Sequence, residues 1–249
     1  GRAETGQTVA TEGYSVTDIT GRTVHFDTPP QRIVTLSSTL DQIVLSVAPP
    51  ERMVAVNMSM KDPINSNMVE VAEQVEKTIQ RPSVEYIVSL HPDIVLIADW
   101  QYLELADPLR DSGLNVVVGR GPHNLAEVRD LVRLTTDAIG EHRRGDILLR
   151  KMDEKLAEIT EKVQSIPESE RKSVVFLSLM STYGGIGSSF DDACHHAGVI
   201  NGVSAYGLRN GQEVTKEVIL AINPDILFLP DYPWKGQAWL DSYIRSYTE

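Results

Sequence analysis

Hydrophobic and polar positions follow two patterns along this chain, one typical of short strands and one typical of helices. Branched and polar residues alternate from Tyr14 to Phe26 around a Thr-Gly-Arg turn, which predicts a short hairpin. Short apolar runs predict strands at 32–36, 53–56, 94–98, 116–118, 173–179 and 226–229. Helical spacing predicts helices between them, at 40–47, 103–112, 124–140, 190–197 and 239–247. This alternation favours mostly parallel sheets that are covered on both faces.

One segment of this pattern occurs twice. Residues 83–96 read SVEYIVSLHPDIVL, and residues 215–228 read TKEVILAINPDILF. A shift of 132 positions superposes Glu85 on Glu217 and Asp93 on Asp225. In each copy an acidic residue opens an amphipathic turn, a Pro-Asp pair ends it, and an apolar run of strand length follows. Because solenoid units are much shorter, the repeat predicts two similar α/β lobes, one in each half of the chain.

A long helix is expected between the two halves. Its apolar stripe recurs every three or four residues, at Leu148, Met152, Leu156, Ile159, Val163 and Ile166. A helix of roughly twenty residues is about 30 Å long and acts as a strut, which allows rocking more readily than wide hinge closure. We therefore expect a lobe at 14–140, a connecting helix at 141–166 and a second lobe at 172–249. The second lobe has fewer predicted strands, so we expect it to be cut short.

Composition narrows the range of partners. The 249 residues carry a formal net charge of −12, which argues against nucleic acid and against an anionic membrane surface. The single cysteine, Cys194, has no internal disulfide partner. The first dozen residues are small and polar, so either a targeting segment has been removed or none existed. No cysteine that could carry a lipid lies near Gly1, which leaves membrane anchoring open.

Motifs of enzymes and metal sites are missing from the sequence. It contains no HExxH, CxxC or GxSxG pattern, and the glycines at 184, 185 and 187 lack the lysine of a phosphate loop. His195 and His196 stand beside Cys194, but neighbouring helical residues point about 100° apart and do not converge on one ion. We therefore expect no catalytic residue, no cofactor and no protein-held metal.

Candidate ligand contacts lie in the loops that follow the strands. In open parallel sheets, ligands bind outside the carboxyl ends of the strands. These loops hold six of the fifteen aromatic residues and two arginines, which suits a bulky, flat or partly apolar ligand. The alternative for each ring is packing at the base of its loop, and for Met58 packing is the favoured explanation. The predicted ligand-contact residues are Ser38, Met58, Trp100, Tyr102, Arg120, Tyr183, Tyr206, Arg209, Tyr232 and Trp234.

Together these features resemble a known family. The opening TDITGRTVHFDTPPQRIVTLSSTLDQIV, the two copies of the repeat and the long helix look like the substrate-binding proteins of ABC importers for ferric siderophores, haem or cobalamin. The resemblance runs from Tyr14 to the end of the chain. It implies two Rossmann-like α/β lobes with mostly parallel sheets, joined by one long α-helix, with the ligand cleft between them. It also implies no catalysis and a place outside the cytoplasm, in the periplasm or as a membrane-anchored lipoprotein.

The resemblance also implies roles for particular residues. Members of the family use one glutamate on each lobe to meet arginines of the two permease subunits, and Glu85 and Glu217 hold the matching positions. Trp100 matches a position that is often a ligand contact. The strand and helix that usually follow the second lobe are absent after Glu249, which fits the expectation of a shortened lobe. The implied partners are an ABC permease dimer and a metal-chelate ligand, and the chain itself is expected to be a monomer.

The ligand is expected to be a ferric siderophore, with haem second and cobalamin third. A catecholate siderophore is anionic and needs several cationic side chains, whereas only Arg120 and Arg209 are well placed, so a neutral hydroxamate is favoured. Haem needs an axial ligand, for which Tyr102, Tyr183, Tyr206 and His123 are candidates. A metallocluster enzyme of similar plan would need several cysteines to hold its cluster, whereas this chain has one. A signalling or adhesion module that kept this fold but lost transport stays open.

Overall fold

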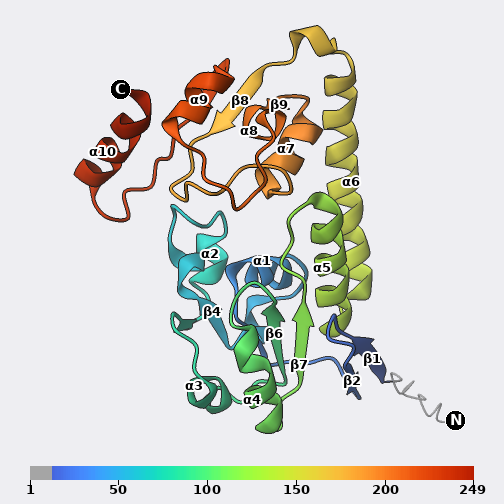
Figure 1. Ribbon diagram of the computed structural model, residues 1–249. Helices are drawn as coiled ribbons and strands as arrows, with labels where there is room; N and C mark the ends of the chain where they lie inside the picture. Colours follow the sequence, from blue (N-terminus) through green and yellow to red (C-terminus); the bar gives the residue numbers. More distant parts are fainter. Residues whose placement is uncertain (1–12) are drawn as a thin grey trace, which may run out of the picture. The chain divides into compact units, whose positions relative to one another are not determined.

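The computed structural model describes residues 13–249 of the chain (Figure 1). It divides into two compact units. Unit 1 extends to Gly121 and also includes Asp130–Leu148, and unit 2 comprises Pro122–Arg129 and Leu149–Glu249. The long helix α6 (His142–Gln164) begins in unit 1 and continues into unit 2.

Unit 1 is built around parallel strands. Strand β6 (Ile94–Ala98) pairs with β3 (Ile33–Thr35) and β7 (Val116–Gly119), and β4 (Ala55–Asn57) pairs with β5 (Lys77–Ile79). A parallel bridge between Ile33 and Met53 joins the two groups, so the spatial order is β5-β4-β3-β6-β7. The helices in this part of the chain are α1 (Ser38–Val47), α2 (Val69–Ala72), α3 (Val84–Ser89), α4 (Ala106–Asp111) and α5 (Leu125–Ala138). Every residue of β6 is buried, as expected for a parallel strand covered on both faces.

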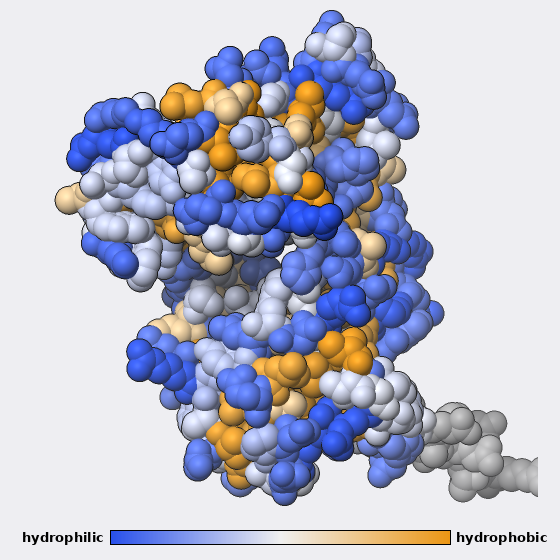
Figure 2. Space-filling view, in the orientation of Figure 1, coloured by the Kyte–Doolittle hydropathy of each residue, from blue (hydrophilic) through white to orange (hydrophobic). Residues whose placement is uncertain are grey.

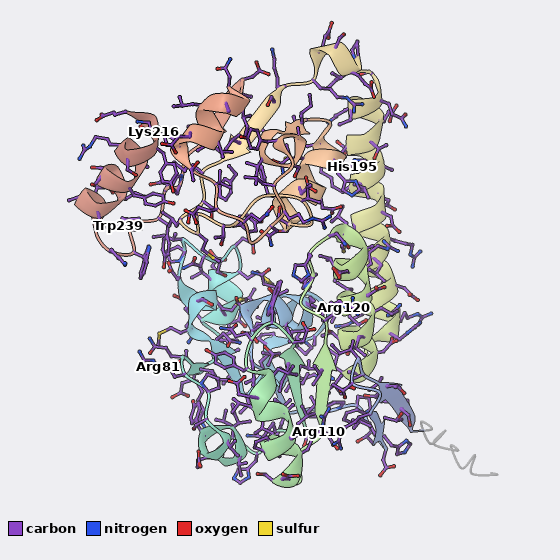
Figure 3. The ribbon with its side chains drawn as sticks, in the orientation of Figure 1. Arg81, Arg110, Arg120, His195, Lys216 and Trp239 are labelled. Carbon is purple, nitrogen blue, oxygen red and sulfur yellow. The ribbon has the colours of Figure 1, made fainter. Side chains whose placement is uncertain are left out.

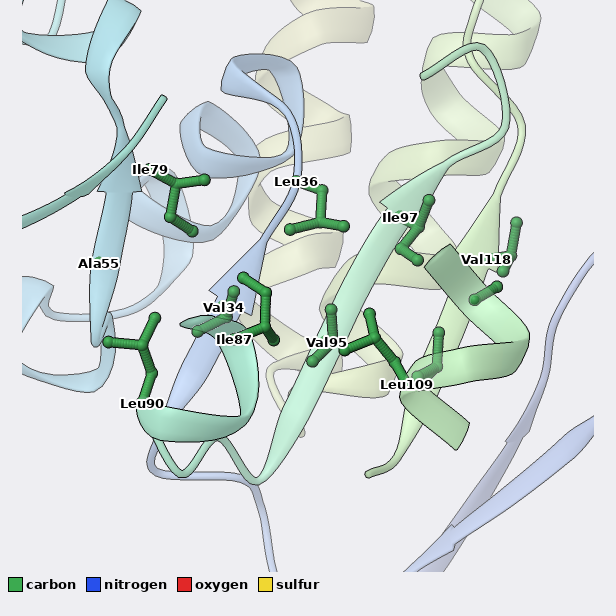
Figure 4. Close-up of a cluster of buried hydrophobic side chains, with 12 residues drawn as sticks. Val34, Leu36, Ala55, Ile79, Ile87, Leu90, Val95, Ile97, Leu109 and Val118 are labelled. Carbon is green, nitrogen blue, oxygen red and sulfur yellow. The ribbon is translucent and has the colours of Figure 1, made fainter. Parts of the chain in front are cut away.

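The core of unit 1 lies between this sheet and helices α3 and α4. Figure 4 shows Val95 and Ile97 of β6 beside Ile87 of α3 and Leu109 of α4. The hairpin β1 (Tyr14–Thr17) and β2 (Thr23–Phe26) is attached to this unit by the buried side chain of Asp18. Its Oδ2 atom accepts hydrogen bonds at 2.9 Å from Arg110 Nη2 and from the backbone N–H of Val118.

Unit 2 has its own parallel sheet, in the order β10-β8-β9. The strands are β8 (Ser173–Phe176), β9 (Ile200–Asn201) and β10 (Ile226–Phe228). Its helices after α6 are α7 (Ser189–Ala197), α8 (Gly202–Tyr206), α9 (Lys216–Ile222) and α10 (Gln237–Thr248). Strand β10 is an edge strand, and Phe228 is exposed, as is Leu220 on α9. Figure 2 shows hydrophobic side chains on the surface in this part of unit 2.

The sequence repeat is a structural repeat. In both copies a hydroxyl residue caps the helix, since Ser83 Oγ accepts from the N–H of Tyr86 and Thr215 Oγ1 accepts from that of Val218, each at 3.2 Å. The residue before each Pro-Asp pair is left-handed, with φ of 50° at His91 and 49° at Asn223. The predicted pair of α/β lobes with mostly parallel sheets is therefore confirmed.

Several boundaries differ from the sequence expectation. Helix α6 covers His142–Gln164, against the 141–166 expected for the connecting helix, and β8 ends at Phe176 rather than Leu179. Two segments for which no helix was predicted contain short ones, a 3₁₀ turn at Met58–Lys61 (η2) and α8 at Gly202–Tyr206. Strands β5 and β9 and helix α2 have at most four residues each, which is too short for a hydrophobic period to be recognised. Further 3₁₀ turns occupy Pro50–Arg52, Leu103–Leu105 and Glu168–Glu170.

Within residues 13–249, no helix combines the length and the apolar character needed to cross a membrane.

Candidate functional site

Four predicted ligand-contact residues lie at the carboxyl edge of the unit 1 sheet. Ser38 is the first residue of α1, Met58 starts η2 directly after β4, Trp100 follows β6 by two residues, and Arg120 follows β7 by one. Because β3, β4, β6 and β7 are parallel, their carboxyl ends meet at one edge. Trp100 is 50% exposed, and Met58 and Arg120 are also exposed, so these side chains are accessible to a ligand.

Trp100 is held by the loop that follows β7. Asp99 Oδ1 accepts a hydrogen bond from the N–H of Gly121 at 2.7 Å, which ties the loops after β6 and β7 together. A Cβ atom at Gly121 would lie 2.3 Å from Trp100 Cδ2, so only glycine allows the ring to lie here. The tryptophan thus packs beside the loop that carries Arg120, which Figure 3 labels. Tyr102 differs, because its side chain packs against the hydrophobic core of unit 1.

Three predicted contacts lie in unit 2, in the loop after β8, at the end of α8 and in the loop after α8. The Tyr183 hydroxyl lies 2.5 Å from Ser189 Oγ and accepts a hydrogen bond at 3.1 Å from the N–H of Phe190. Tyr183 therefore has a structural role at the start of α7. Tyr206 ends α8 and is 52% exposed, and Arg209 is exposed in the loop that follows. A parallel bridge between Ile186 and Arg209 brings these two loops of unit 2 together.

The loop after β10 carries the remaining two, Tyr232 and Trp234. Trp234 is 57% exposed, and Lys235 Nζ lies 4.6 Å from the centroid of its ring and 5.5 Å from that of Trp239. These are cation–π distances. Trp239, labelled on α10 in Figure 3, stacks on Tyr243 with centroids 5.6 Å apart. Lys235 was not predicted from the sequence, where its only signal is its place between two tryptophans.

The rest of that aromatic series anchors the loop to unit 2. The Tyr243 hydroxyl donates to the carbonyl oxygen of Ser178 at 2.5 Å, and burial raises the pKa of Tyr243 to about 12. The phenol is therefore neutral at physiological pH and acts as a hydrogen-bond donor. Trp234, by contrast, leaves much of its surface open to a ligand.

A buried carboxyl group lies beneath the edge of unit 1. Asp41 of α1 is fully buried and accepts hydrogen bonds from Thr35, at the end of β3, and from Asn57, at the end of β4. Burial raises the pKa of Asp41 to about 6, although these hydrogen bonds lower it. Asp41 was not predicted from the sequence, because an acidic residue in the first turn of a helix is commonplace.

A separate cavity of about 550 Å³ lies in unit 2, beside helix α7, where Figure 3 labels His195. None of the ten predicted ligand-contact residues lines it, although His123, a candidate axial ligand for haem, does. Its two carboxylates already serve the fold, since Asp192 Oδ2 accepts from the N–H of Leu125 and Asp191 Oδ1 accepts from Asn201 and Ser204. Burial raises the pKa of the adjoining Cys194 thiol to about 11, so the thiol stays protonated. Across the described part of the chain, no group of three or more His, Cys, Asp and Glu residues is arranged to hold a metal ion.

Glu85 and Glu217 occupy equivalent positions in the two units. Each lies in the first turn of its helix, α3 or α9, where the helix dipole favours a negative charge. Both side chains are exposed, and neither forms an ion pair with any residue between 13 and 249. Their carboxylates are accessible to a partner.

Comparison with known proteins identifies relatives of the chain. An uncharacterized ABC transporter substrate-binding lipoprotein of Bacillus subtilis (strain 168), YvrC, is 26% identical over 229 residues, which cover 89% of this chain and 71% of that protein. The haem-binding protein RhuT of Roseiflexus sp. RS-1 has a TM-score of 0.68 at 24% identity, over 79% of this chain and 75% of that one. The molybdate-binding protein MolA of Haemophilus influenzae has a TM-score of 0.70 at 19% identity, over 86% and 73%. These two structures share the fold.

A family model decides the assignment. Residues 33–238, most of the chain, match the model described as periplasmic binding protein. Proteins of this family act outside the cytoplasm and bind solutes rather than catalyse reactions. The expectations from the sequence of a binding protein, of its extracytoplasmic place and of a non-enzymatic role are therefore confirmed. The chain belongs to the periplasmic binding protein family, as a substrate-binding protein of an ABC transporter.

Proposed function

We propose that this protein captures an iron complex, a ferric siderophore in first place, and delivers it to the permease of an ABC importer. The observation that carries the proposal is the set of exposed aromatic side chains in strand-end loops, above all Trp100 and Trp234. Rings of this kind contact a bulky ligand with partly apolar surface over a large area, whereas a small oxyanion needs hydrogen-bond donors instead. The ligand contacts we propose are eight of the residues predicted from the sequence, with Lys235 added: Ser38, Met58, Trp100, Arg120, Tyr206, Arg209, Tyr232 and Trp234. Tyr102 and Tyr183 are left out, because the first packs on the core of unit 1 and the hydroxyl of the second is engaged at the start of α7.

The charges at these loops favour a ligand with little net charge. The strand-end loops carry two arginines among the proposed contacts, Arg120 and Arg209. Lys235 lies near two indole rings, so its charge already interacts with their π-electrons. A tris-catecholate ferric complex carries several negative charges and needs more cations than these. We therefore favour a neutral ferric hydroxamate.

Glu85 and Glu217 are the proposed docking residues for the permease. Their equivalent places on α3 and α9 provide one exposed carboxylate per unit. Two such carboxylates match a partner made of two similar subunits that each present a cation.

Haem is the second candidate. Tyr206 supports it, because its exposed phenol at the end of α8 is available as an axial ligand, whereas the hydroxyl of Tyr183 is engaged with Ser189 and Phe190. RhuT and a second structural neighbour, HmuT, are haem-binding proteins of the same fold. Cobalamin is the third candidate and is one of the probes in the test below. A binding module without a transport role is the alternative if none of the probes binds.

The test is a titration of the purified protein with a ferric trihydroxamate, a ferric catecholate, haemin and cobalamin. Tryptophan quenching reports binding, and visible absorbance reports any new axial ligand to iron. We expect saturation by the trihydroxamate alone, without a change in its iron ligands. Saturation by haemin, with a spectral shift that Tyr206→Phe removes, would favour haem instead. No response to any of the four would contradict the proposed function.

A further inference from the structure

Three side chains join the ends of β3 and β4 to helix α1 in unit 1. Thr35 Oγ1 lies 2.6 Å from Asp41 Oδ1, and Asp41 Oδ2 accepts from both the backbone N–H and the Nδ2 of Asn57, each at 2.7 Å. Asn57 Nδ2 also lies 3.2 Å from the carbonyl oxygen of Thr35. We call Thr35, Asp41 and Asn57 the Asp41 clamp. Met58 directly follows Asn57, and Ser38 lies three residues after Thr35; both are proposed ligand contacts.

The hydrogen bonds of the clamp are complete only when Asp41 carries a proton. The Thr35 hydroxyl has one hydrogen but two acceptors in reach, Asp41 Oδ1 at 2.6 Å and the carbonyl oxygen of Ser37 at 2.8 Å. When Asp41 is ionised, the hydroxyl serves only one of them. When Asp41 carries a proton on Oδ1, it donates to Thr35 Oγ1, and the hydroxyl donates to Ser37. The protonated clamp therefore satisfies every one of these groups, which matches the elevated pKa of Asp41.

Charged groups around α1 are engaged elsewhere. Strands β3, β4 and β6 contribute none, η2 contributes Lys61, whose Nζ donates to the carbonyl oxygen of Val75, and Arg144 of α6 donates to that of Val47 at the far end of α1. The causes of the pKa shift are burial and the hydrogen bonds of Thr35 and Asn57. Asp41 thus has hydrogen-bond partners in place of a cation.

Unit 2 contains a counterpart. Asn201 ends β9, as Asn57 ends β4, and its Nδ2 donates at 3.0 Å to Asp191 Oδ1, on the helix before that strand. The same Nδ2 lies 2.8 Å from the carbonyl oxygen of Gly184 in the loop after β8. Asp191 lies three residues after the cap Ser188, whereas Asp41 lies four after the cap Ser37, so the pair is equivalent in role rather than in register. Both units therefore fix a strand-end loop with an aspartate–asparagine pair.

We propose that Asp41 and Asn57 are positioning residues, which hold the loops at Ser38 and Met58 in the geometry that binds the ligand, and that the proton shared with Thr35 completes this geometry. The proposal rests on the proposed function for the ligand itself. We propose the same positioning role for Asp191 and Asn201 in unit 2. Neither pair contacts the ligand.

The test compares wild-type protein with Asp41→Asn, Asp41→Ala and the control Asp93→Ala. Asparagine at 41 reproduces the protonated clamp, since its Nδ2 donates to Thr35 and its Oδ1 accepts from Asn57. Asp93 is the matched control, because it accepts hydrogen bonds from residues at the opposite end of β3. The readouts are hydrogen exchange of the backbone amides at 37–38 and 57–59 and the affinity for the ferric trihydroxamate and for haemin, from pH 5 to pH 7.5.

We expect Asp41→Ala to speed exchange at both loops at least tenfold more than Asp93→Ala, which destabilises unit 1 from the opposite end of β3. We expect Asp41→Ala to weaken binding by a similar factor, while Asp93→Ala leaves the affinity unchanged. We expect wild-type affinity to fall severalfold between pH 5 and pH 7.5, and that of Asp41→Asn to stay constant. Unchanged exchange at the loops in folded Asp41→Ala would overturn the proposal, as would unchanged affinity. Wild-type protein that binds neither probe would contradict the proposed function, while the exchange measurement would still decide whether the clamp fixes the loops.

Discussion

Asp225 Oδ2 accepts a hydrogen bond at 2.8 Å from the backbone N–H of Ser173, the first residue of strand β8. Asp93 does the same in unit 1, where its Oδ2 accepts from the N–H of Arg32 at 2.9 Å and from that of Gln31 at 3.0 Å. The Pro-Asp pair of the sequence repeat therefore fixes the start of the neighbouring parallel strand in each unit. This gives the repeat a physical reason that is independent of any ligand.

Removal of either aspartate should destabilise its own unit. We expect Asp93→Ala and Asp225→Ala each to lower the free energy of unfolding by about 1–2 kcal/mol, the effect of leaving a strand N–H without its charged acceptor. Trp100 reports the unfolding of unit 1 by fluorescence, and Trp234 and Trp239 report that of unit 2, so urea titrations of single-tryptophan versions separate the two. A loss that appears in the opposite unit, or none at all, would contradict this assignment.

Stability should depend on the proton of Asp41. Its pKa is about 6 in the folded protein against 3.8 for the free side chain, so the folded state binds this proton more tightly than the unfolded state. The stabilisation is complete below pH 4 and is lost as the pH rises to 6, and it amounts to about 3 kcal/mol for two pKa units.

Asp41→Asn has no such proton. We expect the unfolding free energy of the variant, relative to that of the wild type, to rise by about 3 kcal/mol between pH 4 and pH 7. Urea unfolding at each pH measures this difference. A difference that stays constant over this range would show that Asp41 is ionised throughout.

Gly121→Ala should displace the ring of Trp100. The new Cβ would collide with Trp100 Cδ2, and a buried clash of this kind forces the side chain to move. We expect affinity for the ferric ligand to fall on the order of tenfold, as for one lost aromatic contact. The control is a double-mutant cycle, in which Gly121→Ala costs little once Trp100 is alanine. Equal losses in both backgrounds would mean that the glycine acts by another route.

Charge reversal at Glu85 and Glu217 should separate transport from binding. We expect the double variant Glu85→Lys, Glu217→Lys to lower uptake in cells at least tenfold, because like charges then face each other at the permease. Its affinity for the ligand should be unchanged. Glu104→Lys with Glu161→Lys is the control, since it makes the same charge change at two other exposed positions. Uptake that survives the first pair, or is lost equally with the second, would refute the docking role.

Much of this architecture was predictable from sequence, because its main features are local. Glu85 and Glu217, the Pro-Asp pairs and the apolar runs after them recur in order, and the stripe from Leu148 to Ile166 marks a helix by itself. Short elements carry no such signal. Gly202–Tyr206 forms a helix although it starts with glycine and has only five residues, and its packing next to β8 and β9 decides the outcome.

The candidate site was less accessible to sequence reasoning. The edge loops followed from the rule for parallel sheets, and Trp100 and Trp234 are exposed in such loops. That rule does not tell which ring turns inward, and Tyr102 packs on the core instead. The Asp41–Asn57 pair depends on β4 lying beside β3, and the contact of Lys235 with Trp239 depends on the turn that starts α10. Neither contact can be predicted from the spacing of residues along the sequence.

The most direct measurement is a crystal structure of the protein with the ferric trihydroxamate bound. We expect iron-complex density against the strand-end loops, with Trp100 or Trp234 within contact distance and with Asp41 and Asn57 in the positions they hold here. Density in the cavity beside helix α7 instead, with Trp100 and Trp234 free of ligand, would contradict it.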